Sequence, residues 1–388
     1  MRSCMVGWSH IPFGRHATLN LEGLISSVTQ SAIEHAQVDA SRIDGIWVGN
    51  LNGGLVPDIF CSSLVSLAEE KLRWVPATRL ENACASGSAA IYAACDALES
   101  GRVKIALVVG AESMTGQSTN EVTRILSGCS YVKEEAAVGL TFPGIFAKYA
   151  QAYFDRYGDQ SDVLAKIAAK NHANGTKNPL AHMRKDLGFE FCNTVSDKNP
   201  MIAPPLRKTD CSLVSDGAVA LVLTTESLAR SFPRAVAFRS RAQVNDLLPL
   251  SRRDLVSFEG PTHAWRKALH GAGCTLDDLS LAEVHDCFTI AELLTYEAMG
   301  LTKRGCGREA LESGTVYRGG RLPVNLSGGL KAKGHPIGAT GVSMHVMAAM
   351  QLCSMAGDLQ IEDASVAGVF NMGGAAVANY VSILERLH

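Results

Sequence analysis

Three short stretches of this sequence carry side chains that could perform nucleophilic and acid–base chemistry. Cys84 lies in residues 80–90, LENACASGSAA, among small residues and directly before a predicted helix. The unpaired N–H groups and the dipole of a helix N-terminus stabilise an anion, so this position favours a reactive thiolate. The alternative is a packing role, because free cysteines are commonly small core residues.

Two histidines offer the base that a nucleophilic cysteine needs. His335 lies in KGHPIGATG, where glycines and proline form a rigid turn that exposes a side chain at a helix start. His285 lies in VHDCF at a similar junction, and Cys287 follows it as a candidate second thiol. Histidine is the side chain best suited to move protons near neutral pH. From the residues alone, structural roles for both histidines and a packing role for Cys287 remain open.

Alternating helix and strand patterns place these stretches at the ends of strands and the starts of helices. The same order of patterns occurs near both ends of the chain, which indicates an α/β fold with two copies of one domain. Coincidence within a common architecture is the alternative. The predicted helices cover residues 20–38, 86–101 and 334–357, the predicted strands cover 43–51, 104–114 and 364–374, and residues 279–301 read as strand, polar turn and helix.

The segment from 118 to 210 differs from both ends. It is expected to contain helices over 141–158 and 161–188, joined by long polar stretches that include proline. Long loops in a compact protein are usually functional. Basic residues of this segment could contact phosphates, although a solvated helical face explains each of them equally well. They are Lys170, Lys177, Arg184 and Lys185.

Composition narrows the class of protein. The chain has 388 residues, of which 47% are apolar, and a formal charge of −2. These values indicate two soluble domains and argue against nucleic-acid binding. The eleven cysteines include no CxxC pair, which argues against a disulfide framework and a zinc site. No signal peptide or run of 18 apolar residues is evident, so we expect a cytoplasmic protein without a membrane span.

Taken together, the motifs resemble those of thiolases. NACASGSAA is similar to the nucleophile segment of that family, and NLSGGLKAKGHPIGATG is similar to its histidine loop. GAESMT, PLRKTDCSLVSDGAVALVL and FNMGGAAVANYV follow the family order, so the resemblance covers essentially the whole chain. It implies two similar βαβαβαββ core domains in five αβαβα layers. The implied boundaries are 1–117 with 211–245 for the N-terminal core, 118–210 for a loop domain, and 246–388 for the C-terminal core.

The resemblance also implies an acyltransferase that cleaves 3-ketoacyl-CoA with coenzyme A, or condenses acyl-CoA in reverse. Cys84 would be the nucleophile and His335 its base. One oxyanion hole would use His335 with a water held by His285, and the other would use the backbone N–H groups of Cys84 and Gly373. Ser212 would contact the pantetheine of CoA. The implied protein has no metal or tightly bound cofactor, uses CoA as co-substrate and forms a homodimer or homotetramer.

Two departures from the usual thiolase motifs concern the second thiol. The chain has HDCF where most thiolases have Asn-Glu-Ala-Phe, and Asn371 takes the position of the family's second cysteine. The sterol-carrier-protein-type branch resembles this chain in both respects, and there the HDCF cysteine supplies the thiol. Cys287 is therefore the expected replacement. A condensing enzyme for a specialised product and a catalytically idle binding subunit are the alternative functions.

Overall fold

A mixed sheet runs through the whole of the computed structural model, which describes residues 2–388. Its nine strands follow the order β3-β2-β4-β7-β1-β8-β11-β10-β9. In the middle, β1 and β8 share only two residue pairs, so the sheet consists of two halves joined at a narrow seam. The strands are β1 (Ser3–His10), β2 (Gly45–Gly49), β3 (Ala77–Leu80), β4 (Ile105–Glu112), β7 (Gly217–Thr225), β8 (Val236–Asn245), β9 (Leu281–Val284), β10 (Val366–Gly373) and β11 (Ala378–Arg386).

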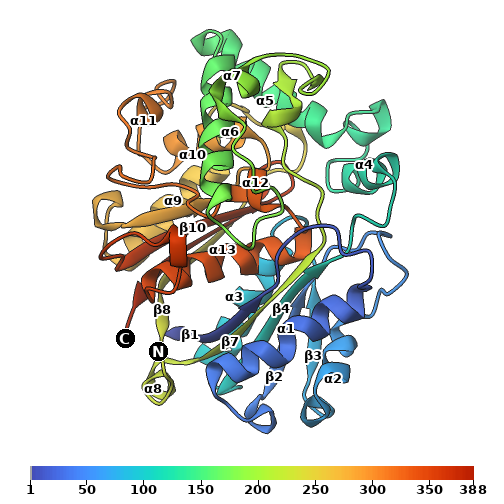
Figure 1. Cartoon of the computed structure of the whole chain (residues 1–388), viewed down its shortest axis with the longest axis vertical. Coiled ribbons are helices and arrows are strands. Elements are labelled where there is room, and N and C mark those ends of the chain that lie inside the picture. Colours follow the sequence, from blue (N-terminus) through green and yellow to red (C-terminus); the bar gives the residue numbers. More distant parts are fainter. Residues whose placement is uncertain (1) are drawn as a thin grey trace.

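The two halves repeat one topology. The first half has the order β3-β2-β4-β7-β1, and the second has β9-β10-β11-β8, with a parallel bridge from Ala282 to Val324 in the place of the missing edge strand. α1 (Leu21–Ala36) packs on the outer face of the first half and α9 (Glu259–Ala272) on that of the second. Between the halves lie α3 (Ser86–Glu99) and α13 (Ile337–Leu352), as Figure 1 shows. This arrangement confirms the predicted α/β fold in five layers.

The central position of α13 follows from its composition. Nearly all of its residues are buried, as expected for a helix covered on every side, whereas α1 is buried along one face only. α13 crosses α3 where small residues let the two backbones approach. A Cβ atom added to Gly87 of α3 would lie 2.8 Å from the carbonyl oxygen of Gly338 and 2.9 Å from the backbone nitrogen of Val342. The glycine at position 87 therefore permits the close crossing.

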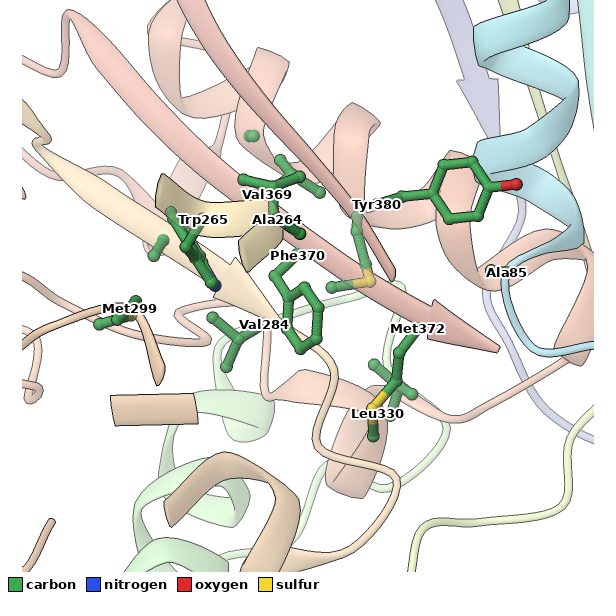
Figure 2. Packing of buried hydrophobic residues seen from close by; sticks show 14 of the residues in the cluster. Ala85, Ala264, Trp265, Val284, Met299, Leu330, Val369, Phe370, Met372 and Tyr380 are labelled. Carbon is green, nitrogen blue, oxygen red and sulfur yellow. The ribbon is translucent and has the colours of Figure 1, made fainter. Parts of the chain in front are cut away.

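The outer core of the second half is built around β10. Phe370 faces Trp265 of α9, with their ring centroids 6.4 Å apart. Figure 2 shows these two rings beside Val284 of β9. The next residue on β10, Asn371, has its side chain on the opposite face, where it contacts Ser88 of α3. This alternation along the strand places one polar side chain in the central layer.

Residues 118–210 connect β4 to β7 of the first half and lie at the top and right of Figure 1. The helix predicted over 141–158 is confirmed as α5. The helix predicted over 161–188 is wrong beyond Thr176, because Pro179 disfavours helical geometry in the residue before it and the chain then bonds to the 329–333 helix. The elements are α4 (Thr119–Ser127), α5 (Phe142–Tyr157), α6 (Ser161–Thr176), α7 (Gly188–Asn193), β5 (Met201–Ala203) and β6 (Leu206–Arg207).

The four basic residues of this segment differ in burial. Lys170 is buried and its Nζ lies 2.8 Å from the carboxylate of Glu292, so the predicted contact with phosphate is wrong for this residue. Lys177, Arg184 and Lys185 are exposed, and a phosphate contact remains a prediction for them. Burial of the ion pair was not visible in the sequence because Glu292 is distant along the chain.

The predicted domain boundaries remain predictions. β8 pairs with β11 along its whole length, which favours a boundary before Val236 instead of after Asn245.

Within residues 2–388, no helix combines the length and the apolar character that crossing a bilayer requires.

We predict that Gly87→Ala destabilises the central layer. The added methyl group meets backbone atoms, so it should lower the free energy of unfolding by about 1–3 kcal/mol. Chemical unfolding followed by circular dichroism measures this change. Gly116→Ala is the matched control, since a Cβ atom there meets nothing within 4 Å. Equal stability of the two variants would contradict the tight crossing of α3 and α13.

Candidate active site

A tight turn before α3 presents Cys84. Ala83 adopts a left-handed conformation with φ of 49°, and the N–H of Ala85 donates to the carbonyl of Asn82 at 3.0 Å. A non-glycine residue in this region of backbone space is strained and is often found at functional sites. The thiol accepts a hydrogen bond from the backbone N–H of Gly374. The turn thus points the sulfur away from the helix and toward the second half of the molecule.

His335 occupies the turn between α12 (Gly329–Lys333) and α13. Its Nδ1 lies 2.7 Å from Oγ1 of Thr340, whose hydroxyl donates to the carbonyl of Pro336 at 2.8 Å. Because the hydroxyl hydrogen is used in this way, Oγ1 accepts the hydrogen on Nδ1. The neutral imidazole therefore has an unprotonated Nε2, which is the form that a general base needs.

His285 and Cys287 lie in the turn that joins β9 to α10 (Thr289–Ala298). The rings of His285 and His335 are nearly perpendicular, with their centroids 5.2 Å apart. Donor atoms of Cys84, His285 and His335 all lie within 4.8 Å of one another. The three side chains are therefore close enough to act on one bound carbonyl group.

A mainly apolar pocket of about 230 Å³ opens onto the sulfur of Cys84. Cys287 and His335 line it together with Ser212, whose N–H donates to the carbonyl of Cys287 at 2.9 Å. An apolar pocket with a few polar groups at one end is typical of a small-molecule site. Its apolar wall comprises Met114, Val122, Leu126, Phe142, Pro143, Ile202, Val214, Phe288 and Ile337.

Burial controls the protonation of the nucleophile and the base. Burial raises the pKa of Cys84 to about 12. Burial together with the nearby Lys333 ammonium lowers the pKa of His335 to about 3. Burial also raises the pKa of Cys287 well above its usual range. A helix start alone would lower the pKa of Cys84, and burial outweighs that effect. The resting pair is a neutral thiol and a neutral imidazole.

Two buried carboxylates hold the loops that carry the site. Glu112, at the end of β4, accepts hydrogen bonds from the N–H groups of Leu51 and Gly338 at 2.9 and 3.0 Å. Asp286 accepts from the N–H groups of Leu330 and Lys331 in α12 at 2.6 and 3.2 Å. Burial raises the pKa of each carboxyl to about 7. These bonds tie the turn before α13 and the turn after β9 to neighbouring elements.

The structure brings Cys84, His285, His335, Cys287 and Ser212 to one place. Gly373 lies against the carbonyl of Asn82, and its role as an oxyanion donor remains a prediction.

Sequence reasoning did not assign roles to Gly374, Glu112 and Asp286. In the sequence, the roles of Asp286 and Gly374 were indicated only by their positions next to His285 and Gly373. Nothing in the sequence around Glu112 indicated that its carboxylate would reach Gly338.

Comparison of the sequence with known protein families gives two matches, which together cover nearly the whole chain. The N-terminal domain of thiolases matches residues 4–227, and the thiolase C-terminal domain-like family matches residues 242–386. The chain therefore belongs to the thiolase family. The predicted resemblance is confirmed at this level, whereas membership of the sterol-carrier-protein branch is a finer assignment.

The curated relatives of this chain include proteins with two different names. Acetyl-CoA acetyltransferase of Methanothermobacter thermautotrophicus is 34% identical over 385 residues, covering 98% of this chain and 99% of that protein. Human sterol carrier protein 2 is 30% identical over 91% of this chain, which spans 66% of that protein.

Among solved structures, human mitochondrial 3-ketoacyl-CoA thiolase in complex with CoA has a TM-score of 0.77 at 18% identity, covering 100% of this chain and 98% of that chain. An Ltp2-ChsH2(DUF35) aldolase has a TM-score of 0.84 at 20% identity, covering 99% and 97%. Both similarities show the fold.

We predict that alkylation of Cys84 in the free protein depends steeply on pH. Since the pKa of the thiol is raised, the thiolate fraction should grow about tenfold per pH unit between pH 7 and 10. Peptide mass spectrometry after timed treatment with iodoacetamide measures the rate at Cys84, with N-acetylcysteine as the control thiol. A fast rate that is constant from pH 6 to 9 would indicate a resting thiolate and contradict the neutral pair.

Proposed function

We propose that this chain catalyses acyl transfer of the thiolase type. In one direction, CoA cleaves a 3-ketoacyl-CoA to acetyl-CoA and a shortened acyl-CoA; the reverse reaction is a Claisen condensation. The observation that carries this proposal is that Cys84, His335 and Cys287 line one apolar pocket, with His285 clustered beside Cys84 and His335. The complete set of reactive groups argues against the idle binding subunit considered from the sequence.

The first step forms an acyl-cysteine. Nε2 of His335 takes the proton from the thiol as the sulfur of Cys84 attacks the 3-keto carbon of the substrate. The bond between C2 and C3 then breaks, and its electron pair passes to the thioester enolate of the departing two-carbon unit. Because the neutral pair is favoured at rest, proton transfer accompanies the attack instead of preceding it.

The second thiol completes the carbon–carbon step. Cys287 donates its proton to C2 of the enolate, so acetyl-CoA leaves and a thiolate remains at Cys287. Incoming CoA gives its thiol proton to that thiolate and attacks the acyl carbon on Cys84. The sulfur of Cys84 departs and recovers its proton from His335. Each group thus returns to its starting state.

The enolate and the tetrahedral intermediates place negative charge on oxygen atoms, which require donors. His335 with a water held by His285 is the proposed donor set for one oxygen, and the N–H groups of Cys84 and Gly373 form the other. Ser212 is proposed to contact the pantetheine arm, since it lines the pocket beside Cys287. CoA acts as a co-substrate in this scheme.

The branch and the assembly are also proposals. HDCF at residues 285–288 and the similarity to sterol carrier protein 2 support the sterol-carrier-protein type. A homodimer or homotetramer is supported by β3, which lies at the edge of the sheet beside the exposed side chains of Ile59, Phe60 and Trp74. An unpaired edge with apolar neighbours is suited to pairing with a second copy.

We predict that Cys287→Ala separates the two half-reactions. The variant should still form an acyl adduct on Cys84 from acetyl-CoA, because the nucleophile and His335 are intact. Cleavage of acetoacetyl-CoA should fall by about 10²–10⁴-fold, because the general acid is lost. Intact-mass spectrometry measures the adduct, and the loss of thioester absorbance measures cleavage.

Cys84→Ala is the companion variant and should lose both the adduct and the cleavage. Turnover of acetoacetyl-CoA by this variant at the wild-type rate would overturn the proposed function. Wild-type cleavage by Cys287→Ala would instead assign that cysteine to packing alone.

A further inference from the structure

Asn371, at the position that the motif resemblance assigns to the second cysteine of thiolases, has its side chain between the nucleophile turn and His285. It stands on β10, is fully buried and contacts three residues, two from the α3 turn and helix and one from the turn after β9. Its Oδ1 lies 2.7 Å from Oγ of Ser88. Its Nδ2 lies 3.2 Å from the carbonyl oxygen of Cys84 and 2.9 Å from Nδ1 of His285.

These contacts determine which way the amide faces. The carbonyl oxygen of Cys84 can only accept a hydrogen bond, so the NH₂ group of Asn371 must face it, and Oδ1 accepts the hydroxyl hydrogen of Ser88. The second hydrogen of the NH₂ group then points at Nδ1 of His285. An imidazole nitrogen that receives this hydrogen cannot carry one of its own.

The orientation of the amide sets the tautomer of His285. Burial lowers the pKa of His285 well below its usual value, with His335 adding to the effect, so the ring is neutral and has one N–H group. With Nδ1 occupied as an acceptor, that hydrogen is on Nε2. Nε2 is buried and has no hydrogen-bond partner within residues 2–388, and the His285 ring belongs to the cluster with Cys84 and His335.

We infer that Asn371 is a positioning residue, which holds His285 in the tautomer that has Nε2–H free to donate to the water of the proposed oxyanion hole. This inference rests on the proposed acyl-transfer function for its catalytic consequence, but the tautomer itself does not depend on turnover. Two residues of this chain thus compensate for the absence of the family's second cysteine. Cys287 supplies the thiol, and Asn371 orients the histidine that stands where other thiolases have asparagine.

The same amide joins the nucleophile turn to His285. One NH₂ group contacts both the carbonyl of Cys84 and the ring of His285, so the distance between the sulfur and the donor is held by a single side chain. Donors that are held in place before the reaction stabilise charge in the transition state without reorganisation. Loss of one such donor lowers kcat by about 10²–10³-fold in other acyl-transfer enzymes.

The direct test is ¹⁵N NMR of the free protein labelled at histidine, with the His285 signals assigned by their loss in His285→Gln. We expect an unprotonated Nδ1 and a protonated Nε2 in the wild type. Asn371→Asp should reverse this pattern, since a carboxylate accepts hydrogen bonds and would draw the hydrogen to Nδ1. A wild-type ring protonated at Nδ1 would overturn the inference, whether or not the protein is active.

Kinetics provide the second readout. Asn371→Asp should lower kcat at pH 8 by about 10²-fold, and kcat should recover as the pH falls and a second proton restores Nε2–H. The titratable groups beside His285 are Cys84 and His335, with the Lys333 ammonium close to His335, and Asp286 and Cys287 follow His285 in the same turn. The pH profile of kcat for the wild type should show no such recovery at lower pH. Equal pH profiles for the two proteins would contradict the inference.

Two further variants separate positioning from general stability. Asn371→Ala should reduce kcat by about 10²-fold when His285 is present and by less than about threefold in the His285→Gln background, where no tautomer exists. Equal losses in both backgrounds would assign Asn371 to packing alone. Asn379→Ala is the matched control, because Asn379 is a buried asparagine on β11 that bonds only to backbone carbonyls.

Discussion

The close crossing of α3 and α13 is the constraint on which the rest of the structure depends. Each helix belongs to one of two repeated halves, and each begins directly after a reactive residue, Cys84 or His335. Because Gly87 lets the two backbones approach, the two helix starts open into the same pocket. Neither half could form the site alone, since each supplies only one member of the nucleophile–base pair.

Burial gives this site its chemistry. It removes the resting charge from Cys84 and from His335, so the ion pair forms only while the substrate is attacked. The groups that hold the loops are buried as well, and Glu112 and Asp286 accept hydrogen bonds from backbone N–H groups of the turns they support. Polar groups with satisfied hydrogen bonds can be rigid in a low-dielectric interior. The geometry of the reactive groups therefore depends on buried carboxylates that never contact the substrate.

Much of this organisation could be predicted from the sequence. Cys84 and His335 lie in short motifs at helix starts. Such local patterns predict which helix or turn a residue belongs to, even when its neighbours in space are unknown. The resemblance to thiolases then supplied the five layers and the companion residues. The α6 helix was predicted too long because its stop depends on Pro179 and on bonds to α12.

Contacts between distant residues could not be predicted in the same way. The buried Lys170 forms an ion pair with Glu292, which lies 122 positions further along the chain. The raised pKa of Cys84 reflects burial by both halves, which a helix-start argument does not include. In the sequence Asn371 indicated only a missing cysteine, because its partners Cys84, Ser88 and His285 are all more than 80 positions away along the chain.

The central claim, that two helix starts combine into a site for a covalent acyl intermediate, is tested most directly by acyl exchange. The protein is incubated with acetyl-CoA and isotopically labelled CoA, without a second acyl substrate, and the label in acetyl-CoA is followed by mass spectrometry. The account predicts that label enters acetyl-CoA until the two pools equilibrate, because Cys84 carries the acetyl group between CoA molecules. Absence of exchange in a preparation that cleaves acetoacetyl-CoA would contradict it.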